Sequence, residues 1–101
     1  MPGTYLERLA ARTDRVGSVL CLGLDPDPAA LPAGFPPTLD GIEAFATLVL
    51  DAALAHVAAV KPNLAFFEAF GSAGLAALER VRVRIPHDVP VIADAKRGDI
   101  G

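Results

Sequence analysis

Apolar residues recur along this chain in two alternating patterns, one helical and one a short continuous run. The helical pattern, with apolar residues three or four positions apart, begins near Thr4, Asp40 and Ser72. Each helical segment is followed by an apolar run of strand length, and these runs cover residues 18–24, 58–61 and 91–93. Strands that alternate with helices favour a parallel sheet assembled from right-handed units. The pattern therefore predicts an α/β fold.

Residues near the helix starts predict where each helix begins. Thr4 and Glu7 have the three-residue spacing of a capping box. Asp40 is predicted to cap the second helix. Residues 71–74, Gly-Ser-Ala-Gly, could be taken for a phosphate-binding loop, but they match no complete fingerprint of such loops. A helix break, after which Ser72 caps the third helix, is the better interpretation.

Two segments between the periodic regions have distinctive compositions. Residues 26–38 contain five prolines and one glycine, which predicts a rigid, irregular loop that is long enough to be functional. Asp27 lies between two of these prolines and is expected to bond within the loop. Phe66, Phe67 and Phe70 are expected to pack in the core beneath a helix.

Composition restricts the class of protein further. The chain has 101 residues, 52% hydrophobic and 21% charged, which predicts one folded domain that is neither disordered nor membrane-spanning. The formal net charge of -3 gives no reason to expect nucleic acid as a partner. The amino-terminal residues have no apolar core of signal-peptide type. The single cysteine, Cys21, suits a reducing cytoplasm and is expected to be a buried small hydrophobic residue.

Charged residues stand at the carboxyl ends of all three predicted strands. Asp25 closes the first run, Lys61 closes the second, and Asp94 and Lys96 follow the third. Functional residues of parallel α/β folds gather where the strands end, so these side chains are expected to converge on one site. The structural alternatives are a turn carboxylate for Asp25 and, for Lys61, an edge lysine whose ammonium reaches water.

Residues 94–99 follow the pattern Asp-x-Lys-x-x-Asp, which sets Lys96 between two carboxylates. Alternate residues of a strand share a face, so Asp94 and Lys96 should project to the same side, about 7 Å apart along the strand. Asp99 should lie in the loop that follows Gly98. Burial favours the neutral form of a lysine, and flanking carboxylates favour its ammonium. The pattern predicts a charged proton donor held within a site, and the alternative is a salt bridge at a solvated strand end.

Three motifs coincide with the predicted strand ends. They are Leu22-Gly-Leu-Asp25, Lys61-Pro-Asn-Leu-Ala-Phe-Phe-Glu68 and Ala93-Asp-Ala-Lys-Arg-Gly-Asp-Ile-Gly101. In this order they resemble the motifs of the orotidine 5'-phosphate decarboxylase family, and the second is similar to the longer bacterial subgroup. The resemblance covers essentially the whole chain. It implies a (β/α)8 TIM barrel that converts orotidine 5'-phosphate to uridine 5'-phosphate and carbon dioxide in pyrimidine biosynthesis, without a cofactor or a metal.

The resemblance also implies a role for each charged residue. Lys96 matches the general acid that protonates C6 of the pyrimidine as carbon dioxide leaves, and Asp94 lies beside the substrate carboxylate. Lys61 joins the charged network and, with Asp25, contacts the ribose hydroxyl groups. Asp99 resembles an aspartate that crosses a homodimer interface to complete the neighbouring site. A small nucleotide substrate, a homodimer and a cytoplasmic location follow from the same resemblance.

A barrel of this type takes about 250 residues. We therefore expect residues 1–101 to be the amino-terminal part of a single TIM-barrel domain, holding about the first three βα units. The phosphate- and base-binding residues would then lie beyond Gly101, and the chain alone should have no useful activity. Two other classes stay open. A related metal-dependent sugar-phosphate lyase or decarboxylase would lose activity on chelation, and a non-catalytic α/β module would bind a nucleotide without turnover.

Overall fold

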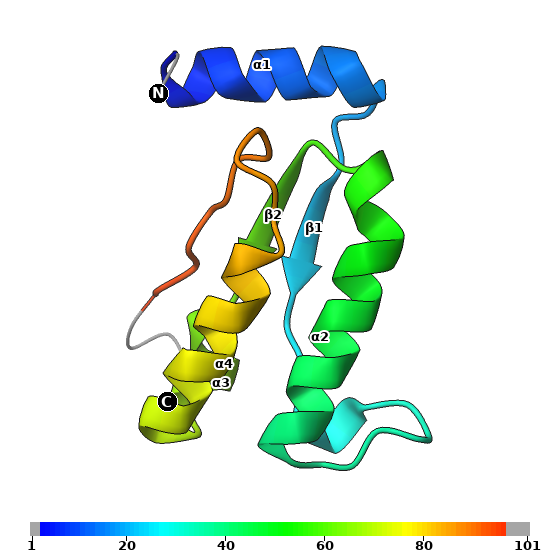
Figure 1. The fold of residues 1–101 in the computed structure, drawn as a ribbon, viewed down its shortest axis with the longest axis vertical. Coiled ribbons are helices and arrows are strands. Elements are labelled where there is room, and N and C mark those ends of the chain that lie inside the picture. Colours follow the sequence, from blue (N-terminus) through cyan, green and yellow to red (C-terminus); the bar gives the residue numbers. More distant parts are fainter. Residues whose placement is uncertain (1–2, 97–101) are drawn as a thin grey trace.

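The computed structural model describes residues 3–96, in which helices pack on a small parallel sheet (Figure 1). Its helices are α1 (Tyr5–Val16), α2 (Leu39–Ala53), α3 (Leu64–Glu68) and α4 (Gly71–Val83), with short 3₁₀ helices η1 (Pro28–Ala30) and η2 (Leu54–His56). Its strands are β1 (Cys21–Leu24) and β2 (Ala59–Pro62). The predicted alternation of helices and strands is confirmed, and the short helix α3 is an addition that the apolar pattern did not predict.

The strands of the sheet run parallel, with Gly23 of β1 opposite Lys61 of β2. The predicted third strand at residues 91–93 is present as two isolated parallel bridges on the other side of β2, and not as a continuous strand. The bridged pairs are Val60 with Val91 and Asn63 with Asp94. All three chain segments therefore point the same way, and their carboxyl ends lie at one edge of the sheet.

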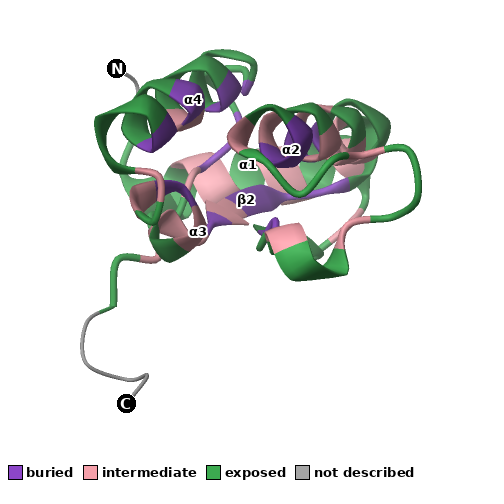
Figure 2. Cartoon of the chain, turned by 90° about the horizontal axis from the view of Figure 1, so that it is seen from below, coloured by how far each residue is buried: buried purple, intermediate pink, exposed green. Residues whose placement is uncertain are grey.

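One face of this sheet forms the hydrophobic core with α2 and α4. Figure 2 shows both helices on the same side of β2, each with a row of buried residues. Leu22 and Val60 lie opposite each other in the sheet, and both pack in the same core cluster as Ile42 and Val81. Because side chains alternate between the two faces of a strand, Lys61 projects from the face opposite the core.

Sequence signals predict the cap of α1 correctly and the cap of α2 incorrectly. The predicted capping box of α1 is confirmed, because Thr4 Oγ1 accepts from Glu7 N at 3.2 Å while the Glu7 carboxylate accepts from Thr4 N at 2.8 Å. The prediction of Asp40 as the cap of α2 is wrong, because Thr38 Oγ1 accepts from Gly41 N. Thr38 has the extended backbone of a cap residue, whereas Asp40 already lies in the first helical turn.

A tight turn joins α3 to α4. Gly71 has a φ of 67°, a left-handed conformation that favours glycine. Phe70 occupies the cap position of α4 without a side-chain hydrogen bond, so the prediction of Ser72 as the cap is wrong. Phe67 is fully buried, as predicted. Its carbonyl oxygen approaches α4 so closely that a Cβ atom on Gly74 would lie 1.7 Å from it.

An internal side-chain hydrogen bond and a contact with α2 help to hold the proline-rich segment at residues 26–38. Asp27 accepts a hydrogen bond from Ala29 N at 2.9 Å and caps η1, which confirms its predicted role within the loop. The Phe35 ring meets Phe45 of α2 edge to face, with ring centroids 5.5 Å apart. The second half of the loop therefore packs against α2, the helix that follows it.

The start of β1 is more exposed than the sequence predicted. Cys21 is exposed and not buried, and Val19 and Leu20 before it are 83% and 63% exposed. Within residues 3–96, β1 pairs with β2 alone. A continuous apolar run is buried only when both sheet faces are covered, and the described residues cover mainly the face with α2 and α4. The prediction for Cys21 is wrong for this reason.

Candidate functional site

Lys61, Asp94 and Lys96 meet where β2 and the third segment end. Lys61 Nζ lies 3.1 Å from Asp94 Oδ2, and Lys96 Nζ lies 2.5 Å from the same oxygen. Asp94 and Lys96 share a face of their segment, as alternate residues of an extended chain should. The predicted meeting of the two lysines is thus confirmed. The sequence pattern placed a lysine between two carboxylates, whereas the structure also places the Asp94 carboxylate between two ammonium groups.

Asp94 is the least exposed member of this cluster. Its side chain is 12% exposed, compared with 39% for Lys61 and 50% for Lys96. Hydrogen bonds from Lys96 and from Lys61 lower the pKa of Asp94 to about 2, because both stabilise the ionised carboxylate. The carboxylate therefore stays charged at neutral pH. It holds two ammonium groups side by side at a partly open face, where they can stabilise negative charge that develops on a bound molecule.

Asp25 lies at the same edge of the sheet but outside the cluster. It follows β1, and its Oδ2 lies 3.3 Å from the position that a Cβ atom on Gly23 would take. The carboxylate therefore folds back over Gly23, which is opposite Lys61 in β2. No hydrogen bond or ion pair joins Asp25 to Lys61 within the described residues. Asp99, the last predicted site residue, lies outside the residues that the structure describes.

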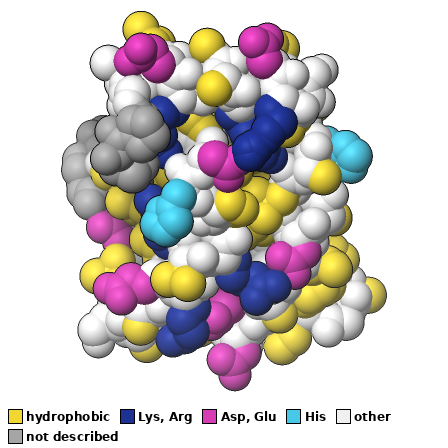
Figure 3. Space-filling view, turned by 45° about the horizontal axis from the view of Figure 1, so that its top comes forward, with side chains coloured by type: hydrophobic (Ala, Val, Ile, Leu, Met, Phe, Trp, Pro, Cys, Tyr) yellow, Lys and Arg dark blue, Asp and Glu magenta, His cyan; other side chains and the backbone are white. Residues whose placement is uncertain are grey.

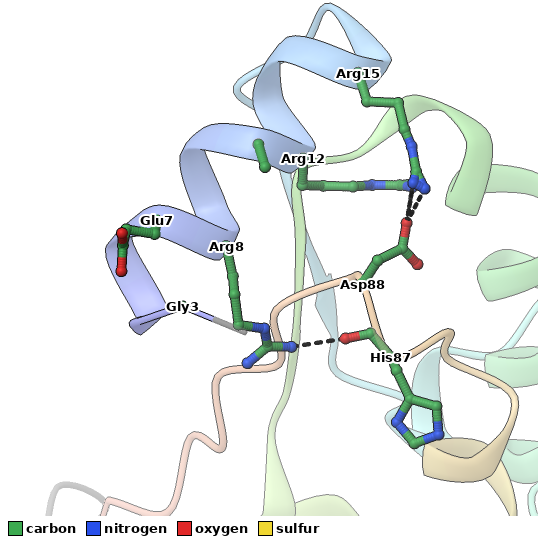
Figure 4. A pocket seen from close by; sticks show the side chains of 8 residues that line it. Gly3, Glu7, Arg8, Arg12, Arg15, His87 and Asp88 are labelled. Carbon is green, nitrogen blue, oxygen red and sulfur yellow. Dashed lines mark hydrogen bonds and ion pairs between the residues drawn. The ribbon is translucent and has the colours of Figure 1, made fainter. Parts of the chain in front are cut away.

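A hollow of about 580 Å³ lies at the opposite end of the sheet, between α1 and the loop before residue 91 (Figure 4). Three arginines of α1 face it, and each is already bonded across it. Arg8 donates to the His87 carbonyl at 2.7 Å, and Arg15 forms an ion pair with Asp88 at 2.5 Å. These arginines hold α1 against the rest of the fold. We therefore interpret the hollow as part of a structural contact, separate from the cluster of Lys61, Asp94 and Lys96.

The Arg12 side chain is 10% exposed, compared with 58% for Arg15. Its guanidinium donates to the carbonyl oxygens of Leu54 at 2.5 Å and Val57 at 3.2 Å, and it lies 3.5 Å from Asp88. It therefore satisfies carbonyl groups just after α2 and just before β2. The sequence does not single out Arg12, because the residues that it bonds lie 45 and 42 positions away along the chain.

Replacing Arg12 is expected to destabilise the protein more than replacing its neighbour on the next turn. Arg12→Ala removes two charge-assisted hydrogen bonds to partly buried carbonyls and should lower the free energy of unfolding by about 2–4 kcal/mol. Arg15→Ala removes a largely exposed ion pair and should cost less than about 1 kcal/mol. Urea denaturation of both variants measures the difference, and equal losses would contradict the role assigned to Arg12.

The surface outside the cluster carries mixed charge. On the face that Figure 3 shows, basic and acidic side chains are interspersed among apolar ones, without a continuous basic area. Within residues 3–96, no group of three or more His, Cys, Asp and Glu side chains is arranged to hold a metal ion. Across the same residues, every helix is too short or too polar to cross a bilayer.

Comparisons with known proteins point to one family. The model of the "Orotidine 5'-phosphate decarboxylase / HUMPS family" matches residues 18–101. The orotidine 5'-phosphate decarboxylase of Roseiflexus sp. is 49% identical over 98 residues, which cover 97% of this chain and 36% of the relative. A Toxoplasma gondii structure, provisionally assigned as an orotidine-monophosphate-decarboxylase, superposes with a TM-score of 0.81 at 48% identity and covers 94% of this chain and 32% of that one. The Leishmania donovani OMP decarboxylase has a TM-score of 0.74 at 37% identity, covering 98% of this chain and 36% of that one.

These similarities confirm the predicted fold class. The parallel strands with their intervening helices correspond to the first βα units of a (β/α)8 barrel. The chain spans about a third of the length of the curated relatives that it matches.

Proposed function

Because the chain belongs to the orotidine 5'-phosphate decarboxylase / HUMPS family, we propose that its lysine–aspartate cluster decarboxylates orotidine 5'-phosphate to uridine 5'-phosphate. The observation that carries the proposal is the shared contact of Lys61 and Lys96 with one carboxylate oxygen of Asp94. This places two cations and a permanent anion where the parallel strands end, which is where barrel enzymes act on their substrates.

Lys96 is the proton donor in this proposal. The bond between C6 and the carboxylate carbon breaks, carbon dioxide leaves, and the electron pair stays on C6. That carbanion lies in the plane of the ring, so the π system does not delocalise it and a nearby cation must stabilise it. The Lys96 ammonium supplies this charge and then transfers a proton from Nζ to C6. The resulting neutral amine recovers a proton from water.

The other charged residues orient and bind the substrate. Asp94 lies beside the departing carboxylate and keeps the Lys96 ammonium pointed at the same place, since it already binds that group at 2.5 Å. Lys61 completes the network and, with Asp25, contacts the ribose hydroxyl groups. The position of Asp25 at the same sheet edge and on the same face as Lys61 supports this assignment.

The remaining parts of the proposal rest on the resemblance of the motif at residues 93–101. Residues 1–101 form the amino-terminal part of a single (β/α)8 domain. The enzyme works in the cytoplasm as a homodimer, in which Asp99 reaches the neighbouring site. The net charge of -3 agrees with a small-molecule nucleotide as the partner in place of nucleic acid.

The proposal is tested with protein produced from its complete coding sequence. Incubation with orotidine 5'-phosphate should yield uridine 5'-phosphate and carbon dioxide in equal amounts, followed by ultraviolet absorbance and by release of labelled carbon dioxide. A chelator should leave the rate unchanged. Absence of product would contradict the proposal, and loss of activity on chelation would favour a metal-dependent relative.

A further inference from the structure

The backbone at residue 63 joins the carboxyl ends of all three strand segments. Asn63 N donates to the carbonyl oxygen of Leu24 at the end of β1, at 2.9 Å. The next amide, Leu64 N, donates to the carbonyl oxygen of Asp94 at 3.1 Å. Asp94 N in turn donates to the carbonyl oxygen of Pro62, also at 3.1 Å. The chain on both sides of Asn63 therefore holds the backbone of Asp94 in place.

The Asn63 side chain defines the turn that makes these contacts possible. Its Oδ1 accepts a hydrogen bond from Ala65 N at 3.2 Å and caps α3, while its own backbone is extended, with φ of −90° and ψ of 109°. The chain passes from strand to helix at this single residue. A helix of five residues does not persist through its own hydrogen bonds, so the position of its first turn depends on the cap and on packing.

We propose that Asn63 is a positioning residue for Asp94. Its cap of α3 fixes the Leu64 amide against the Asp94 carbonyl, and this holds the Asp94 carboxylate between Lys61 and Lys96. Asn63 lies next to Asp94 in the sheet register, on the same face as Lys61. Its effect on turnover rests on the proposed function, whereas its effect on the Leu64 amide does not.

The test compares three variants of the protein made from its complete coding sequence. Asn63→Ala should lower kcat about tenfold or more, because a small misplacement of catalytic groups is costly. It should also speed hydrogen exchange of the Leu64 amide about tenfold or more. Asn63→Ser, whose hydroxyl can accept the same bond, should restore both values to within about threefold of the parent protein.

Thr4→Ala is the matched control. Thr4 caps α1 through a hydrogen bond of the same 3.2 Å length, and Figure 1 shows α1 and α3 at opposite ends of the sheet. This variant should lower the melting temperature while leaving kcat and Leu64 exchange unchanged. A purely structural role for Asn63 would make the two alanine variants behave alike.

Two outcomes would overturn the proposal. One is parental kcat and parental Leu64 exchange in Asn63→Ala. The other is a loss of kcat in Asn63→Ala that Asn63→Ser does not restore, while Leu64 exchange stays normal. The side-chain carboxamide of Asn63 would then contact the substrate directly. If the parent protein does not decarboxylate orotidine 5'-phosphate, the proposed function fails, and the exchange of Leu64 alone then supports or overturns the positioning role.

Discussion

Lys96→Ala is expected to lower kcat for orotidine 5'-phosphate decarboxylation by about 10³-fold or more in the protein made from its complete coding sequence. The variant removes both the cation beside C6 and the proton that C6 must receive. Affinity for uridine 5'-phosphate should change much less, since the product has no carbanion for the ammonium to stabilise. Steady-state assays give kcat, and calorimetric titration gives the nucleotide affinity.

Lys96→Arg separates the two functions of this lysine. Arginine keeps a cation that can pair with Asp94, but its guanidinium does not give up a proton at neutral pH. Turnover should therefore stay low in this variant even where the ion pair with Asp94 is retained. If Lys96→Ala reduces kcat and nucleotide affinity by the same factor, Lys96 contributes uniform binding and the assigned proton transfer is wrong.

The charged cluster could be predicted from sequence because two general rules of sheet geometry define it. A parallel sheet places all strand ends at one edge, and alternate residues of a strand share a face. These rules suffice to bring Lys61 and Asp94 together at one edge of the sheet, although they lie 33 positions apart along the chain. The capping box of Thr4 and Glu7 was predictable for a different reason, because both of its residues lie within one helical turn.

Features that depend on distant partners could not be predicted in this way. The burial of Cys21 depends on what lies beside β1, which an apolar run does not reveal. Arg12 looks like any surface arginine until the fold brings the carbonyls of Leu54 and Val57 to it. The helix α3 has five residues and is shorter than the window of roughly 11–18 residues over which a helical period can be recognised, so Asn63 could not be identified as its cap.

Glycine 74 belongs to this second group, because its role depends on a carbonyl from another helix. Sequence reasoning treats a glycine inside a helix as a weakness that costs about 1 kcal/mol relative to alanine. Here the backbone of α4 passes so close to α3 that a Cβ atom on Gly74 would lie 1.7 Å from Phe67 O and 2.8 Å from the carbonyl carbon of Phe67. Atoms of different residues do not approach so closely, so one of the helices would have to move.

Gly74→Ala is therefore expected to lower the free energy of unfolding by about 3 kcal/mol or more, despite the higher helix propensity of alanine. The side chain of Phe67 is fully buried, so a shift of α3 would also disturb the core beneath it. Urea denaturation followed by circular dichroism measures the loss.

Ala73→Gly, at an exposed neighbouring position of α4, provides the control and should cost only about 1 kcal/mol through helix propensity. The two substitutions exchange the same pair of residues in opposite directions, so propensity alone predicts opposite signs for them. A destabilised Gly74→Ala would show that the contact with the Phe67 carbonyl outweighs propensity. A stabilised Gly74→Ala would instead show that α3 and α4 do not approach each other as closely as this structure requires.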